Sequence, residues 1–108
     1  MPNVTVFISG EEMPSEQSRA RFAQACTALC TETLKASLDK VHIIFSEAHH
    51  GRGHPAYIEV KYRLETFRPP AVMNAFMEQV EKELLDATGL LARIRCFGYA
   101  ASDIHGRN

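Results

Sequence analysis

The alternation of hydrophobic and polar residues divides the first half of the chain into three segments. Residues 3–8 alternate with a period of two, which is typical of a strand with one buried face. Pro14 and Ser15 then precede apolar residues that recur every three to four positions from Phe22 to Leu34, which predicts an amphipathic helix from Pro14 to about residue 36. A second strand is expected at residues 41–45.

The second half of the chain repeats this order after a turn-rich segment at residues 49–55. Alternation at residues 58–64 predicts a third strand with one polar face. Pro69 and Pro70 favour a helix start immediately afterwards, and Gly89 is typical of a helix C-cap. A fourth strand is expected at residues 94–97.

This order predicts one α/β (α+β) domain over residues 1–108, built from two β-α-β halves at about 2–50 and 51–101, with a tail at 102–108. Parallel β-α-β units cross over with a right hand. Two such units therefore give a four-stranded mixed sheet with both helices on one face. The other face still carries apolar side chains, so we expect it to be covered in an oligomer.

Composition excludes several classes of function. Twelve Lys and Arg against thirteen Asp and Glu give a net charge of −1, so the chain lacks the charge expected of a nucleic-acid binder. Its apolar runs are too short to span a membrane. Three cysteines without framework spacing favour a cytoplasmic location, and Cys26 and Cys30 are expected to be core residues.

The residue with the most distinctive possible chemistry is Pro2. Methionine before a small residue is ordinarily removed, and removal of Met1 would leave a secondary amine held by a strand that begins at Asn3. Burial and neighbouring cations lower the pKa of such an amine toward neutrality, where a general base works best. A terminal proline without this context would carry no meaning.

Three features together resemble the tautomerase superfamily. They are Met1-Pro2 leading into a strand, Ser15-Glu16-Gln17 opening a helix, and the segment from Ser37 to Glu47, which is similar to the second-strand motif of 4-oxalocrotonate tautomerase (4-OT). The resemblance covers most of residues 2–101, in the doubled form of macrophage migration inhibitory factor and 5-carboxymethyl-2-hydroxymuconate isomerase. It implies a catalytic amino-terminal proline, a homotrimer with sites at subunit boundaries, and no cofactor.

The chain departs from the 4-OT pattern at the arginines that serve a dicarboxylate substrate. Glu11 and Glu12 stand where one arginine is expected, and His42 stands at the second position. The internal repeat places Arg95 in the fourth strand as the counterpart of His42, where it could bind a substrate anion or be a cross-strand partner.

Further candidates come from the resemblance. Arg68 matches at most one arginine of the decarboxylase and dehalogenase branches, and Lys35 lies near the lysine of the inhibitory-factor pocket. Tyr99 lies near the pocket aromatics of the family. No metal is expected, because the histidines of residues 49–54 lack ligand spacing.

We therefore predict a trimeric tautomerase or isomerase that moves a proton beside the carbonyl of a small 2-oxo or 2-hydroxy-enoate acid. Pro2 is the expected base, with Arg95, His42, Lys35, Arg68 and Tyr99 as candidate substrate-binding residues. Two alternatives remain open. One is a decarboxylase or dehalogenase of the same superfamily, and the other is a non-catalytic ferredoxin-like module or dimeric barrel with the same element order.

Overall fold

The computed structural model describes residues 1–108 and contains six regular elements. They are β1 (Asn3–Ser9), α1 (Glu16–Glu32), β2 (His42–Ala48), β3 (Ala56–Arg63), α2 (Pro70–Thr88) and β4 (Ala92–Tyr99). One-turn 3-10 helices lie at Gly10–Glu12, Leu38–Lys40 and Ala101–Asp103. The predicted order of two β-α-β units is confirmed.

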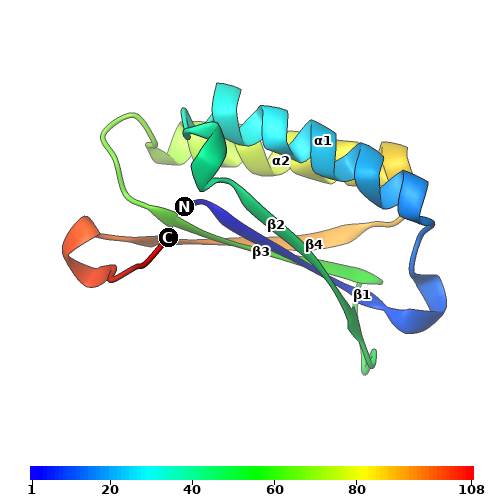
Figure 1. The fold of residues 1–108 in the computed structure, drawn as a ribbon. Coiled ribbons are helices and arrows are strands. Elements are labelled where there is room, and N and C mark those ends of the chain that lie inside the picture. The colour runs from blue at the N-terminus through cyan, green and yellow to red at the C-terminus, as the bar shows by residue number, and fades with distance from the viewer.

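The four strands form one mixed sheet in the order β2-β1-β3-β4. Each β-α-β unit contributes a parallel pair, β1 with β2 and β3 with β4, and the two central strands β1 and β3 are antiparallel. Both helices cover the same face of this sheet, side by side, as Figure 1 shows. The sheet and the placement of the helices agree with the prediction.

The core lies between the sheet and the helices. Alternate strand residues point into it, because successive strand side chains face opposite sides of a sheet. From β1 these are Val4, Val6 and Ile8, and from α1 they include Cys26 and Cys30. The expectation that the two helical cysteines are core residues is confirmed, since neither side chain is exposed.

Both helix starts and the second helix end follow the sequence signals. The Ser15 hydroxyl accepts a hydrogen bond from the Ser18 N–H and caps α1, while Pro70 occupies the first turn of α2. Gly89 ends α2 with φ 76°, a left-handed conformation that glycine adopts without steric cost.

The first helix is shorter than its hydrophobic pattern predicts. It ends at Glu32 instead of about residue 36, because Lys35 adopts φ 57° and turns the chain toward β2. Two strands extend beyond the predicted ranges, β2 to Ala48 and β4 from Ala92 to Tyr99. Pairing with a neighbouring strand, rather than local alternation, sets these lengths.

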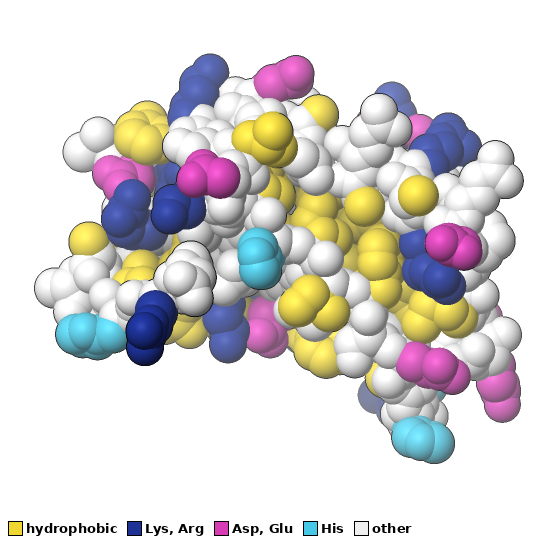
Figure 2. All heavy atoms as spheres, viewed as in Figure 1, with side chains coloured by type: hydrophobic (Ala, Val, Ile, Leu, Met, Phe, Trp, Pro, Cys, Tyr) yellow, Lys and Arg dark blue, Asp and Glu magenta, His cyan; other side chains and the backbone are white.

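The face of the sheet opposite the helices has no cover within the chain. We call it the open face, and its side chains are mixed in character, with Ile44, Phe97 and Tyr99 exposed among charged residues. Figure 2, a side view like Figure 1, shows hydrophobic side chains between the helices and the sheet, with charged side chains around them. None of the helices has the length and apolar character to cross a membrane.

Candidate active site at the amino-terminal end of the sheet

Pro2 lies immediately before β1, and its side chain is fully buried. Its carbonyl oxygen accepts a hydrogen bond of 3.2 Å from the His42 N–H, which ties the start of β1 to the start of β2. Burial of its ring and this hydrogen bond together hold Pro2 in place. A base carried by this residue would have a fixed position relative to the sheet.

Arg68 lies at the same end of the molecule as Pro2 and connects two backbone segments there. Its side chain is only 7% exposed, although it carries a charge. Its Nε atom donates to the Leu34 carbonyl and its Nη1 atom to the Arg63 carbonyl, both at 2.8 Å. Arg68 thus joins the segment after α1 to the end of β3. Its guanidinium also lies 5.1 Å from the centre of the Phe67 ring.

Positive charge surrounds the amino terminus. Burial lowers the pKa of the Met1 amino group below its usual value, and the nearby charges of Lys40, Arg63 and Arg68 lower it further, while Asp39 raises it. Lys and Arg side chains also gather at this end of the molecule in Figure 2. An amine here has the electrostatic setting of a base that works near neutral pH.

Three other predicted residues lie at the same end of the sheet. His42 pairs with Asn3 and is exposed on the open face. Tyr99 pairs with Arg63, and its carbonyl oxygen accepts a hydrogen bond of 2.8 Å from the Leu64 N–H. Lys35 is exposed in the turn that follows α1, next to the Leu34 carbonyl that Arg68 binds.

Arg95 lies apart from this group. It pairs with Glu59, which pairs with Thr5, so it is three residues along the strands from the level of Pro2, or about 10 Å. Its Nη1 atom donates to the Ile94 carbonyl at 2.8 Å. The register also differs from the expected correspondence with His42, since Phe97 rather than Arg95 shares the row of His42 across the sheet.

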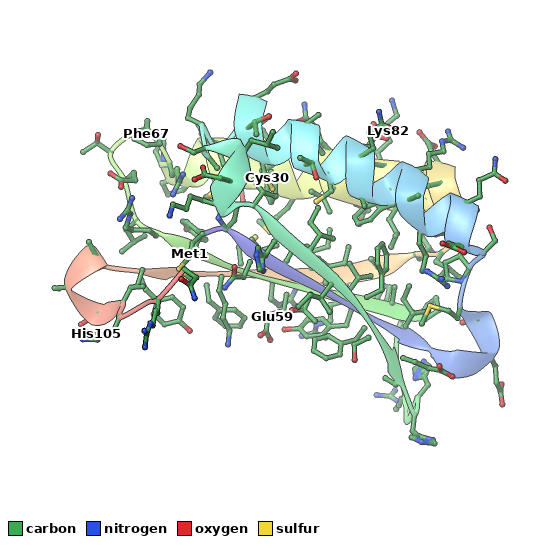
Figure 3. The ribbon with its side chains drawn as sticks, viewed as in Figure 1. Met1, Cys30, Glu59, Phe67, Lys82 and His105 are labelled. Atoms are coloured by element: carbon green, nitrogen blue, oxygen red, sulfur yellow. The ribbon has the colours of Figure 1, made fainter.

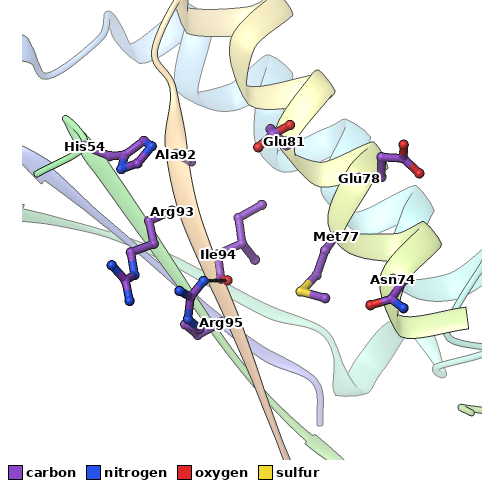
Figure 4. Close-up of a pocket in the computed structure, with 9 residues that line it drawn as sticks. All are labelled: His54, Asn74, Met77, Glu78, Glu81, Ala92, Arg93, Ile94 and Arg95. Atoms are coloured by element: carbon purple, nitrogen blue, oxygen red, sulfur yellow. Dashed lines mark hydrogen bonds between the residues drawn. The ribbon is translucent and has the colours of Figure 1, made fainter. Parts of the chain in front are cut away.

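Arg95 instead borders a cavity between β4 and α2, with a volume of about 510 Å³ (Figure 4). Arg93 and Arg95 line it from the strand, and Glu78 and Glu81 line it from the helix. The cavity thus combines charges of both signs. It holds no side chain that sequence reasoning proposed as a base.

The loop histidines and the cysteines do not form a metal site. No group of three His, Cys, Asp or Glu side chains is arranged to hold a metal ion. In the loop, the Nε2 atom of His50 lies 3.0 Å from the Gly53 carbonyl. The three cysteines are free, and burial raises the pKa of the Cys96 thiol to about 11.

Sequence reasoning missed Lys40, Arg63 and Tyr62. Lys40 lies within the 4-OT-like segment and Arg63 on the polar face of the third strand, and the charges of both act on the Met1 amino group. Tyr62 is buried over Gly98, where an added Cβ would lie only 2.9 Å from the Tyr62 ring. The pairing of β3 with β1 and β4 places Tyr62 and Arg63 at this end of the sheet, and the 3-10 helix before β2 brings Lys40 there, so local sequence alone does not group them.

Comparison with known structures identifies the architecture. The chain superposes on a symmetric trimer structure of a fused 4-OT, W0, with a TM-score of 0.81 and 18% identity, covering 98% of this chain and 94% of that one. It also matches N1, a member of the cis-3-chloroacrylic acid dehalogenase family, with a TM-score of 0.78 and 15% identity, over 97% of this chain and 80% of that one. The chain has the tautomerase-superfamily fold.

A third match with the same fold is a macrophage migration inhibitory factor-like protein from Entamoeba histolytica, with a TM-score of 0.78, 12% identity, and coverage of 98% of this chain and 95% of that one. No protein-family model matches the sequence, and comparison with curated protein sequences gives no match. At these identities the likeness establishes the fold, and the chemistry has to be argued from the residues of this chain.

Proposed function

We propose that this chain, after removal of Met1, is a tautomerase or isomerase in which the Pro2 amine transfers a proton next to the carbonyl of a small 2-oxo or 2-hydroxy-enoate acid. The observation that carries this proposal is the position of Pro2, fixed at the start of β1 among Lys40, Arg63 and Arg68. The tautomerase-superfamily fold supports it. No cofactor is required, because one base can both remove and return the proton.

The chemistry depends on a free secondary amine. While Met1 is present, the Pro2 nitrogen is part of an amide and has no basic lone pair. After its removal, the amine takes the C3 proton of a 2-oxo acid, the C–H electron pair becomes the C2=C3 bond, and the carbonyl oxygen accepts the negative charge. Cations near this oxygen stabilise the enolate, an effect worth several kcal/mol in a site that excludes water.

Proton exchange tests the proposal directly. In D₂O, the processed protein should exchange the C3 protons of 2-oxobutanoate for deuterium, which proton NMR follows without a coupled reaction. Pro2→Ala and a form that retains Met1, verified by mass spectrometry, should both lose about 10²- to 10⁴-fold in exchange rate. Equal rates for the processed and the Met1-retaining protein would remove Pro2 from the reaction and favour a non-catalytic ferredoxin-like module.

A homotrimer belongs to the same proposal. The fused 4-OT structures are described as trimers, and the open face of this chain exposes apolar side chains that a neighbour would cover. We therefore expect a mass in solution of three times 12.1 kDa. A stable monomer or dimer of the active protein would contradict this part of the proposal.

The decarboxylase and dehalogenase branches are a second candidate, because structures described as malonate semialdehyde decarboxylase and as a cis-3-chloroacrylic acid dehalogenase family member share the fold. Arg68 is the residue that would favour them, yet its Nε and Nη1 donors are bound to backbone carbonyls. The protein can be given cis-3-chloroacrylate and malonate semialdehyde in turn. Release of chloride from the first would favour a dehalogenase, and release of CO₂ from the second would favour a decarboxylase. Either result, without proton exchange on 2-oxobutanoate, would overturn the isomerase proposal.

A further inference from the structure

β4 is the last strand of the sheet, so one of its edges has no partner strand within the chain. The Leu64 N–H donates to the Tyr99 carbonyl at the end of the β3–β4 pair. Parallel strands bond through alternate residues, so the peptide groups of Tyr99, and of every second residue before it, face β3. The N–H and C=O groups of Ile94 and Cys96 therefore point outward. An edge of this kind is a template for a further strand.

A side chain of β4 itself binds to this edge. The Nη1 atom of Arg95 donates to the Ile94 carbonyl, with 2.8 Å between the two atoms, so it satisfies an outward acceptor in place of a neighbouring strand. Arg95 is exposed, and this is the one hydrogen bond that its side chain forms. An N–H of an added strand can therefore take its place at the Ile94 carbonyl, which leaves the guanidinium free to bind an anion.

A groove follows the same edge. It is the cavity of about 510 Å³ between β4 and α2, and four consecutive strand residues, Ala92–Arg95, line it on one side. Asn74, Met77, Glu78 and Glu81 line it from one face of the helix (Figure 4). Extended peptides that add to a sheet edge gain affinity from main-chain hydrogen bonds, and pockets beside the edge select their alternate side chains. The β4 edge has both features.

The side chains on the two sides of this edge carry opposite charges. Arg93 and Arg95 are exposed on the open face, because they alternate with strand residues that face the core. Glu78 and Glu81 are exposed on α2, across the groove (Figure 4). None of these four side chains forms an ion pair within the chain. The edge thus has unpaired cations on one side and unpaired carboxylates on the other.

The carboxylate next to Arg95 in the strand register is bound by other groups. Glu59 pairs with Arg95 and lies on the open face, below the sheet in Figure 3. Its Oε1 atom lies 3.6 Å from the Lys61 ammonium, and its Oε2 atom accepts a hydrogen bond from the Tyr57 hydroxyl. Arg95 therefore keeps its charge for a partner outside the chain.

The edge strands of this chain do not match the charge pattern of β4. Pairing of β4 with β4 of a second copy would bring the arginines of both copies to the same face, and like charges opposite one another destabilise a sheet. The other edge strand, β2, has His42, Ile44 and Ser46 on the open face and no carboxylate there. A strand that carries carboxylates on this face has to come from a different protein.

We propose that the β4 edge binds an extended peptide segment of a partner protein in which acidic and basic residues alternate. The segment adds as a fifth strand, so its side chains lie alternately on the two faces. Its acidic side chains lie against Arg93 and Arg95, and its basic side chains cover Met77 with their apolar stems and reach the carboxylates of α2. This inference does not depend on the proposed function, since Pro2 does not line the groove.

Two capped hexapeptides of identical composition test the charge pattern. As a strand, TEKEKT places both of its acids on one face and both of its lysines on the other, whereas TEEKKT places one of each on both faces. In an NMR titration of the isotope-labelled protein, TEKEKT should shift the amide signals of Ile94 and Cys96. TEEKKT should bind about 10-fold more weakly or worse, because it sets like charges against each other. Equal affinities of the two peptides would overturn the proposal.

Variants of the protein test the two sides of the groove. Glu78→Gln and Arg93→Gln should each weaken TEKEKT binding by about two- to fivefold, the range of one exposed ion pair. Asp86→Asn is the matched control, because Asp86 is exposed on α2 but does not line the groove, and its affinity should equal that of the wild type. The same loss in Asp86→Asn as in Glu78→Gln would mean general charge attraction and would contradict the proposed site.

Methylation of the peptide nitrogens separates strand addition from docking by side chains alone. Only every second N–H of an added strand faces β4. TEKEKT methylated at both Glu nitrogens and TEKEKT methylated at both Lys nitrogens should therefore differ, with one of them bound about 10-fold more weakly or worse and the other bound like the parent peptide. Equal effects of the two methylations would exclude a fifth strand.

Amide hydrogen exchange tests whether the edge is open in the free protein. The outward N–H groups of Ile94 and Cys96 should exchange faster than those of Arg95 and Phe97, which face β3, and TEKEKT should slow the exchange of the outward pair. Protection of Ile94 and Cys96 without any peptide would show that a second copy of this chain already covers the edge, and it would overturn the proposal.

Discussion

Two groups of cationic side chains lie on this chain, and they differ in almost every respect that matters for chemistry. At the amino-terminal end of the sheet, Arg68 is buried and bound by two backbone carbonyls, with Lys40 and Arg63 beside the terminus. At the β4–α2 edge, Arg93 and Arg95 are exposed and border the cavity of about 510 Å³. Only the first group lies around Pro2, the proposed base.

The comparison shows that cavity size and site chemistry are separate properties. The cavity of about 510 Å³ is lined by two guanidinium groups, by two carboxylates of α2 and by His54, and Pro2 is not among its residues. The amino-terminal end has only a smaller hollow nearby, but it brings together the buried Pro2 and the cations that lower the pKa of the Met1 amino group. Convergent groups with perturbed pKa values are the better indication of a functional site.

The largest expected difference between the two groups concerns stability. Arg68→Met leaves the Leu34 and Arg63 carbonyls without their donor, so it should lower the free energy of unfolding by about 2–4 kcal/mol. Arg95→Met removes an exposed side chain that bonds only to the adjacent carbonyl, and it should cost less than about 1 kcal/mol. Urea unfolding of both variants measures the difference, and equal losses would show that the hydrogen bonds of Arg68 to the Leu34 and Arg63 carbonyls do not stabilise the fold.

The second difference concerns pH. Arg63 is one of the charges that lower the pKa of the Met1 amino group, and the Pro2 amine, the proposed base, follows it by one residue in the same surroundings. Arg63→Gln should therefore raise the pH at which the exchange rate is half-maximal, by up to about one pH unit. Lys40, Arg68 and Asp39 also face this amine and are unchanged in the variant. The profile of Arg95→Gln should coincide with that of the wild type, and a displacement of both profiles would mean that the effect is not local.

The fold was more predictable from sequence than the site, for a physical reason. Local periodicity, the proline starts and Gly89 determine the elements, and these signals lie within a few residues of what they control. The end of α1 was missed because Lys35, a non-glycine residue, adopts a positive φ. The site depends on the register between strands far apart in sequence, which brings Lys40 and Arg63 beside residue 1 and moves Arg95 away from it.

The smallest expected effect is that of Arg95→Gln on activity, and it tests whether one chain or two build the site. Within one chain, Arg95 lies three residues along the sheet from Pro2 and its guanidinium is turned to the Ile94 carbonyl. The kcat/KM of Arg95→Gln for 2-oxobutanoate exchange should therefore stay within about threefold of the wild-type value. Loss of one oxyanion donor would cost more, roughly 2.7–4 kcal/mol of transition-state stabilisation. In the proposed trimer, however, Arg95 of a neighbouring subunit could approach the Pro2 end of this one. A loss of about 10²-fold in a variant that remains trimeric and melts at the wild-type temperature would show that the neighbour supplies this arginine. Partial recovery in Arg95→Lys would then assign it to the substrate carboxylate, because a lysine keeps the charge but not the bidentate geometry.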